Sequence, residues 1–276
     1  MLKTWRLTRR NTLAMAGILI ISFFLVMALV GPSFAPYSPT QPNLDAILEP
    51  PSAQHLLGTD DTGMDILSRI LWGSRIAFTS ALTIVLVAGG IGTLVGLLAG
   101  WWGGIWDDIL MRITDMFLAF PSLILAMAIA AILRPSLTNA LIAISITYWP
   151  IYARLARSQV LSLKEREFVE AGRAAGQSSG RLLLRHVVPN ALTPLMVQAT
   201  LDMGAVLLIA AGLSFIGFGA QPPTPEWGRM VSDGRMYLQT QWWIATFPAL
   251  AILLFVLGFN FLGDALRDIM DPRSRR

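Results

Sequence analysis

Long apolar runs separated by shorter polar segments dominate the pattern of this chain. A helix rises 1.5 Å per residue, so a run of about 20 residues crosses the roughly 30 Å of hydrocarbon in a bilayer. A helix also satisfies its own backbone hydrogen bonds, which an open sheet in lipid cannot do. The pattern predicts an all-α integral membrane protein with six transmembrane helices, at about 12–31, 78–100, 112–133, 138–157, 191–217 and 242–263.

Composition and charge agree with this topology, because 54% of the residues are hydrophobic and only 14% are charged. One side of the membrane receives most of the cations, namely Lys3, Arg6, Arg9, Arg10, Arg112, Arg154, Arg157, Lys164, Arg166, Arg173, Arg181, Arg185, Arg267, Arg273, Arg275 and Arg276. The other side receives Arg69, Arg75, Arg134, Arg229 and Arg235. Since cytoplasmic loops are enriched in Lys and Arg, the first side is cytoplasmic and both termini lie inside. The basic balance therefore indicates membrane topology and no nucleic-acid binding.

The first apolar run could instead be a signal peptide, since residues 13–30 follow a basic start. The run is longer than a usual signal core, and residues 31–36 contain no A-x-A-type cleavage site. We therefore expect a retained transmembrane helix.

Three parts of the chain follow from these spans. Residues 1–77 form a cytoplasmic tail, the first span and an extracytoplasmic loop, residues 78–263 form the core, and residues 264–276 form a cytoplasmic tail. The loop begins with many prolines and ends with apolar residues at helical spacing after Thr59 and Asp60, either of which can cap a helix. We expect a short interfacial helix there, which packs laterally against the spans or contacts a partner protein.

A polar segment rich in alanine and glycine, residues 168–176, lies in the cytoplasmic loop 158–190 of the core. On a helix, Phe168, Gly172 and Gly176 would share one face, where two missing side chains let another surface approach closely. Packing against the protein's own spans is the alternative. We expect docking of a partner, because the charged neighbours of this segment oppose burial in lipid.

The sequence contains no energy-converting or catalytic motif. The P-loop pattern needs a lysine after glycine, whereas neither Lys3 nor Lys164 follows one. The run around Ser214 departs from the G-x-S-x-G pattern, and the two histidines, His55 and His186, fall on opposite sides of the membrane. We therefore expect no catalytic residue, no metal site and no cofactor bound by this chain.

Asp202 is the one acidic residue near the middle of a predicted span. A carboxylate there costs about 2.5–3.5 kcal/mol unless it meets water or a partner group. With Gln198 and Met203 nearby, Asp202 could line a translocation pathway and meet the ammonium group of a substrate. The alternative is a structural hydrogen bond to a neighbouring helix.

Five motifs in order resemble those of one family over nearly the whole chain. They are LGTDDTGMDILSR at 57–69, FPS at 120–122, LSFIGFG at 213–219, QPPTPEWG at 221–228 and LGDALRD at 262–268. Together with the cytoplasmic segment, which resembles the "EAA" loop, they resemble the "C" permease of the dipeptide, oligopeptide and nickel ABC importers. Glu170 and Gly176 match the recognisable positions of that loop, while Gly172 replaces its second alanine.

The resemblance implies a type I ABC importer permease in a bacterial inner membrane. Its coupling helix would contain Phe168, Glu170, Ala171, Gly172, Arg173, Ala174 and Gly176. It implies a homologous second permease, two ATP-binding subunits that hold ATP and Mg, and an extracytoplasmic binding protein that delivers di- or oligopeptides. Nickel chelate, glutathione or another small solute is the alternative cargo. A secondary transporter or channel is the alternative of another class. Such a protein would normally have coupling-ion residues in several spans, whereas this chain has one acidic residue near the middle of a span.

Overall fold

The computed structural model describes residues 12–270, and this part of the chain contains helices and no β-strand. The helices are α2 Thr12–Phe34, η1 Leu44–Ala46, α3 Ile66–Trp102, α4 Gly104–Leu118, α5 Ser122–Leu133, α6 Leu137–Lys164, α7 Glu167–Ala174, α8 Ser179–Leu182, the π-helical segment η2 Leu183–Val187, α9 Val188–Ile216, α10 Trp227–Gly234, η3 Arg235–Tyr237 and α11 Trp243–Met270. The all-α prediction is confirmed. The predicted tails at 1–11 and 271–276 lie outside the described residues.

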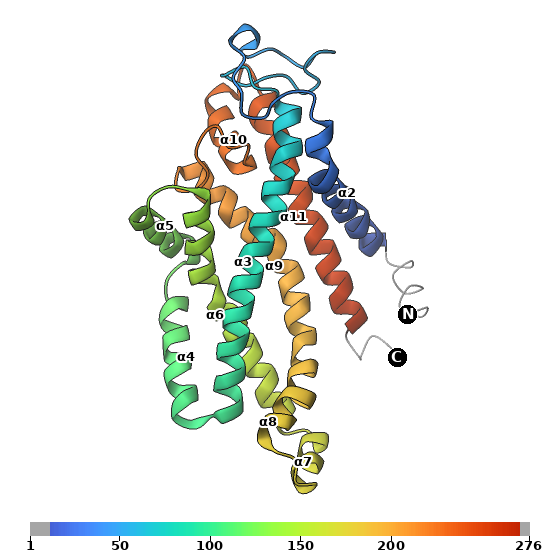
Figure 1. Ribbon diagram of the computed structural model, residues 1–276, viewed down its shortest axis with the longest axis vertical. Coiled ribbons are helices and arrows are strands. Elements are labelled where there is room, and N and C mark those ends of the chain that lie inside the picture. The colour runs from blue at the N-terminus through green and yellow to red at the C-terminus, as the bar shows by residue number, and fades with distance from the viewer. Residues whose placement is uncertain (1–11, 271–276) are drawn as a thin grey trace.

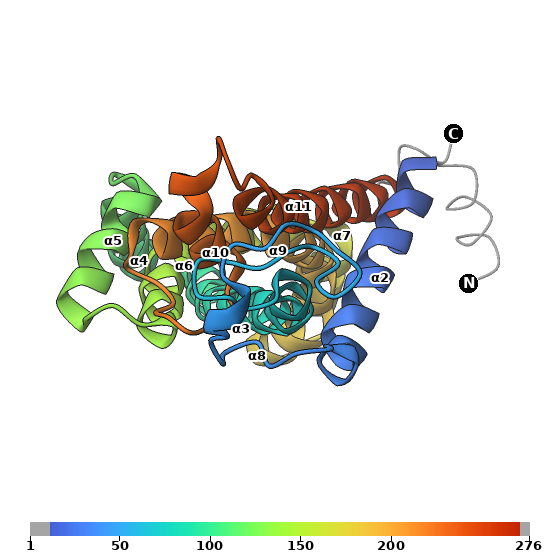
Figure 2. The same cartoon turned by 90° about the horizontal axis from the view of Figure 1, so that it is seen from above.

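The long helices α3, α6, α9 and α11 form a bundle, with α2 packed against α11 and α3 (Figure 1). The irregular segment between α2 and α3 covers one end of this bundle together with α10, as Figure 2 shows from above. The short helices α7 and α8 form the opposite end. The two ends correspond to the predicted extracytoplasmic and cytoplasmic sides, and we call them the outer and inner ends.

The predicted number of six spans is not confirmed. Four helices of the described chain are long and apolar enough to cross a membrane: α2, α3, the run Ser179–Ile216 and α11. The predicted third span is two helices, α4 and α5, which meet at 87° and count as a fifth span only together. Pro121 causes this break, because it lacks an N–H and disfavours helical backbone at Phe120. At the predicted fourth span, α6 is long but less apolar, since it carries tyrosines, hydroxyl residues and arginines.

A single helix replaces the predicted interfacial helix and second span. Helix α3 runs without a break from Ile66 to Trp102, and the expected boundary between 77 and 78 falls inside it. The N-cap of α3 is Asp65, because Asp65 Oδ2 accepts a hydrogen bond of 2.7 Å from the Ser68 N–H. Neither Thr59 nor Asp60 caps this helix. The expectation of a separate helix is wrong because no proline or turn sequence interrupts the apolar spacing.

Buried polar contacts hold the outer segment onto the start of α3. Asp60 Oδ1 accepts hydrogen bonds from the backbone N–H groups of Thr62 and Met64, each at 2.9 Å. Arg69 is 3% exposed, lies 3.6 Å from Asp60 Oδ2 through its Nε, and donates to the Pro39 carbonyl at 3.1 Å. The motif at 57–69 therefore acts as a local scaffold at the outer end.

Glycines let α3 and α6 approach closely. A β-carbon on Gly92 or Gly96 would collide with α6, in the case of Gly96 with the carbonyl oxygen of Ala153 and with Ala156 Cβ at 2.7 Å. Gly100 faces Val160 in the same way, since a β-carbon on Gly100 would lie 2.9 Å from Val160 Cβ. Three small residues at four-residue spacing form the kind of face that packs helices in membranes. The four-residue spacing of these glycines is visible in the sequence, but the spacing alone does not identify α6 as the helix that packs on them.

Candidate functional site

The predicted coupling segment forms helix α7 at the inner end (Figure 1). Glu167 and Glu170 lie in its first turn and Arg173 in its last, so these charges complement the helix dipole. The helix ends at Ala174, and Gly176, two residues further on, has φ +74°. The Gly176 N–H donates to the Arg173 carbonyl at 2.9 Å and the Gln177 N–H to the Gly172 carbonyl at 3.0 Å, as in a Schellman cap.

A small apolar cluster anchors α7 to the bundle. Val169 is fully buried with Trp101, Val160, Leu182 and Val187, which come from α3, α6, α8 and η2. A hydrogen bond of 2.9 Å from Trp101 Nε1 to Ser179 Oγ joins the end of α3 to α8. These contacts join α7 to α3, α6, α8 and η2, and η2 continues directly into α9.

The end of α3 has a further link to α6. Lys164 Nζ donates to the Trp101 carbonyl at 2.7 Å and to the Gly100 carbonyl at 3.3 Å. These carbonyls lie in the last turn of α3, where helix carbonyls lack partners within the helix. Trp101, Lys164 and Ser179 were not predicted as part of the coupling region, because nothing in their spacing pairs residues so far apart.

The glycine face predicted for α7 is wrong in its geometry. Gly172 is buried and faces the protein's own α8, where its β-carbon would lie 2.5 Å from Leu182 Cδ2. Gly176 lies beyond the end of the helix, since its left-handed backbone terminates α7. The exposed face of α7 contains instead Phe168, Glu170, Ala171, Arg173 and Ala174. Phe168 is 43% exposed, so it presents apolar surface among the charged side chains of this face.

The charged residues near the inner end also join α4 to α6. Arg157 makes a two-point ion pair with Asp107, with Nε to Oδ1 at 2.5 Å and Nη2 to Oδ2 at 2.6 Å. Arg154 contacts Asp115 at 2.6 Å in a more exposed position. These two ion pairs join α4, along most of its length, to the inner half of α6.

Asp202 lies at the interface between α9 and α6. It is 3% exposed, and its Oδ1 accepts hydrogen bonds from Tyr148 Oη at 2.9 Å and from Gln198 Nε2 at 3.0 Å. Met203, the third predicted residue of the pathway, is also buried. The structure therefore contains the interhelical hydrogen bond that was the alternative for Asp202. A role in a translocation pathway stays a prediction.

Two further polar atoms lie near this contact. The Oδ2 atom of Asp202 and the hydroxyl of Tyr152 are buried and have no hydrogen bond in the structure. Tyr148 and Tyr152 lie one turn apart on α6, a spacing that places both rings on the same face. These tyrosines were not predicted as partners of Asp202, because the spacing of residues in one helix does not identify the helix beside it.

The chain is similar to known transport proteins along nearly its whole length. Residues 92–276 match the family described as "Binding-protein-dependent transport system inner membrane component", and residues 2–51 match "N-terminal TM domain of oligopeptide transport permease C". A dipeptide transport system permease protein of Alkalihalophilus pseudofirmus is 47% identical over 267 residues, which cover 97% of this chain and 88% of that protein. A probable D,D-dipeptide transport system permease protein of Escherichia coli is 46% identical over 98% of this chain and 90% of its own length.

One further relative and one solved structure are also similar to this chain. A glutathione transport system permease protein of Escherichia coli is 43% identical, over 98% of this chain and 90% of that protein. An inward-facing structure of the methionine ABC transporter MetNI has a TM-score of 0.55 at 20% identity and covers 73% of this chain and 98% of that chain. The fold is therefore that of a type I ABC importer permease. Because the first family match includes most of the chain and the relatives align along nearly all of it, the chain belongs to the family of binding-protein-dependent transport system inner membrane components.

Proposed function

We propose that this chain is the permease subunit of an ABC importer that moves di- or oligopeptides into the cytoplasm. The observation that carries the proposal is the 47% identity to a dipeptide permease over 97% of the chain. A pseudo-symmetric pair with a homologous permease would enclose the pathway. An extracytoplasmic binding protein would deliver the peptide at the outer end, in the inner membrane of a bacterium, with both termini of the chain in the cytoplasm.

The energy would come from two separate ATP-binding subunits that hold ATP and Mg, so the chain itself is not an enzyme. Their docking surface would be the exposed face of α7, with Phe168 as the apolar contact and Glu170 and Arg173 as charged contacts beside it. The buried side of α7 supports this role, because Val169 and Gly172 fix the helix to α3, α6 and α8. Motion of the ATPases would then rock α6 and α9 together.

A second cargo has specific support. The relative named as a glutathione permease is nearly as similar as the dipeptide permeases, at 43% identity. Glutathione is itself a short peptide with charged ends, so the same architecture could accept either. Nickel chelates and other small solutes remain within the same mechanism. A secondary transporter or channel is disfavoured by the family, whose description names dependence on a binding protein.

Uptake in cells that lack this chain tests the cargo. Labelled dipeptide, glutathione and nickel are supplied to cells complemented with the wild-type chain, with vanadate or a proton uncoupler added in parallel. We expect dipeptide uptake that vanadate abolishes and an uncoupler does not. Restoration of nickel or glutathione uptake alone would replace the cargo, and the reverse inhibitor pattern would overturn the ABC mechanism.

Copurification tests the coupling surface. In Phe168→Ser the apolar contact is lost while the buried anchors stay, so the ATP-binding subunits should no longer copurify with the chain. Leu44→Ser is the matched control, since Leu44 is 76% exposed in η1, within the segment between α2 and α3. Wild-type yield of the ATP-binding subunits with Phe168→Ser would contradict the assignment of this face.

A further inference from the structure

A charged pocket of about 320 Å³ opens at the outer end, near the lower limit of volume for small-molecule sites. Three segments build it: the loop before α3, the end of α9, and the run from α10 into η3. We call it the outer charged pocket, and its charged lining residues are Asp61, Arg229, Asp233 and Arg235. Phe215 and Met236 contribute apolar surface. The pocket is separate from both α7 and Asp202.

The two arginines of this pocket are not fully paired with other groups of the described chain. Arg235 has no ion pair within the described residues, and its guanidinium lies 5.7 Å from the centroid of the Phe215 ring. Arg229 pairs with Asp233 through Nη2 at 2.8 Å, but its Nε is buried and has no hydrogen bond. Guanidinium groups bind carboxylates through two parallel N–H donors. The two arginines therefore offer a site for a carboxylate.

The carboxylates of the pocket lie close enough to repel each other. Burial raises the pKa of Asp61, and the neighbouring carboxylates of Asp60 and Asp233 raise it further. Asp61 has no ion pair among residues 12–270. A cation between Asp61 and Asp233 would relieve this repulsion. The pocket thus offers sites for both an anion and a cation.

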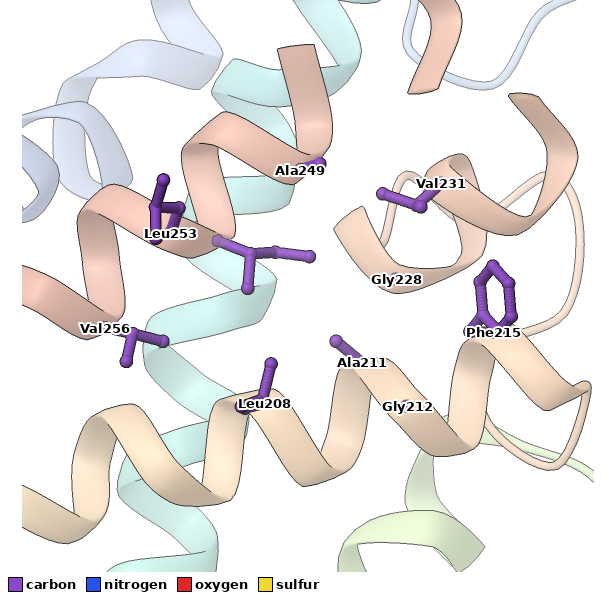
Figure 3. A pocket seen from close by; sticks show the side chains of 10 residues that line it. Leu208, Ala211, Gly212, Phe215, Gly228, Val231, Ala249, Leu253 and Val256 are labelled. Atoms are coloured by element: carbon purple, nitrogen blue, oxygen red, sulfur yellow. The ribbon is translucent and has the colours of Figure 1, made fainter. Parts of the chain in front are cut away.

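Phe215 also lines an apolar groove of about 370 Å³ (Figure 3). Leu208 and Gly212 of α9, Val231 of α10 and Leu253 of α11 line it. Figure 3 shows Phe215 and Val231 at the same end of this groove. Helix α10 presents Val231 to the groove and Arg229 to the charged pocket, so a ligand with charged ends and an apolar side chain would meet suitable surface on both sides.

We propose that the outer charged pocket is a binding subsite for the two termini of a short zwitterionic peptide, with Asp61 and Asp233 facing the ammonium group and Arg229 and Arg235 facing the carboxylate. The inference rests on the proposed function, because it takes the imported peptide as the ligand. A peptide released at the outer end would bind here before it moves further into the bundle. The headgroup of a zwitterionic phospholipid has related chemistry, and the experiment separates the two.

Protection of an engineered cysteine tests the subsite. The chain has no cysteine, so Met236→Cys gives a single thiol, and Met236 is 82% exposed at the pocket. Right-side-out membrane vesicles that contain the assembled transporter, washed free of binding protein, are labelled with a membrane-impermeant maleimide. We expect a free dipeptide to slow labelling, and an N-acetyl dipeptide amide or phosphoethanolamine not to. Thr40→Cys, in a different outer cavity beside Arg75, is the control that no dipeptide should protect.

Charge variants then assign the two termini. On the Met236→Cys background, Asp61→Asn and Arg235→Gln should each raise the dipeptide concentration for half protection about tenfold, as loss of one charged hydrogen bond predicts. Arg75→Gln should leave it unchanged. The subsite is overturned if the free dipeptide gives no protection, or if the blocked dipeptide or phosphoethanolamine protects equally well. It is also overturned if the charge variants have no effect on protection. Dipeptide uptake that persists without protection overturns only the subsite, whereas absence of uptake overturns the proposed function.

Discussion

Gly172 lies so close to Leu182 that a β-carbon on the glycine would be 2.5 Å from Leu182 Cδ2. The neighbouring atom is the end of a flexible side chain, and alanine gains about 1 kcal/mol over glycine within a helix. Gly172→Ala should therefore change stability by less than about 1 kcal/mol. Thermal unfolding of the purified complex measures this, and a strong loss would contradict the expected mobility of Leu182.

Gly172→Leu should behave differently, because a large side chain there must push α8 away from α7. Overpacking of this kind costs about 1–3 kcal/mol. The variant should unfold at lower temperature and lose the ATP-binding subunits on purification. Gly180→Leu is the matched control in α8, since a β-carbon on Gly180 meets no atom within 4 Å. Equal behaviour of the two variants would show that the contact between Gly172 and Leu182 has no special role.

Gly96→Ala should destabilise the protein by about 1–3 kcal/mol, because the new methyl group meets the backbone of α6 at Ala153, which cannot rotate away. Gly90→Ala on the same helix is the control, since a β-carbon there meets nothing within 4 Å. The midpoint of thermal unfolding in detergent distinguishes them. If the unfolding midpoint of Gly90→Ala fell as far as that of Gly96→Ala, the close approach of α3 and α6 would not be the cause of the destabilisation.

The chain pattern predicted the helical class and the existence of α7, because apolar run length and polar interruptions are local properties. The pattern failed where contacts with neighbouring helices determine the structure. Pro121 splits a continuous apolar run into α4 and α5, yet Pro150 lies inside an unbroken α6. The sequence around Gly172 would be the same whether this glycine faced an ATPase or, as in the structure, Leu182. A one-dimensional pattern gives the residues of a face but not the surface that covers it.

Arg69→Gln should loosen the outer segment. The substitution removes the cation beside Asp60 and the hydrogen bond to the Pro39 carbonyl, and loss of a buried charge partner costs about 3 kcal/mol or more. Proteolysis of right-side-out vesicles should then cut the chain between α2 and α3 faster than in the wild type. Arg75→Gln, at an exposed arginine of the same helix, should not change the rate. Equal resistance of Arg69→Gln would contradict the scaffold role of this residue.

Tyr148 and Asp202 should be energetically coupled across α6 and α9. Interhelical hydrogen bonds in membranes contribute about 0.6–2 kcal/mol. Tyr148→Phe removes the donor, and Asp202→Asn replaces a charge-assisted bond with a weaker neutral one, so each should lower stability and the double variant should lose less than the sum. A cycle of the four proteins in thermal or denaturant unfolding gives the coupling energy.

The same variants separate structure from transport. If Asp202 acts only through α6, Tyr148→Phe and Asp202→Asn should reduce uptake of all dipeptides by the same factor, in line with their loss of stability. If Asp202 meets the substrate ammonium group, Asp202→Asn alone should raise the KM, and Tyr148→Phe should not. Because the Asp202 carboxylate is 3% exposed and already accepts two hydrogen bonds through Oδ1, we expect the first result. A KM change confined to Asp202→Asn would restore the pathway role and require α6 and α9 to separate during transport.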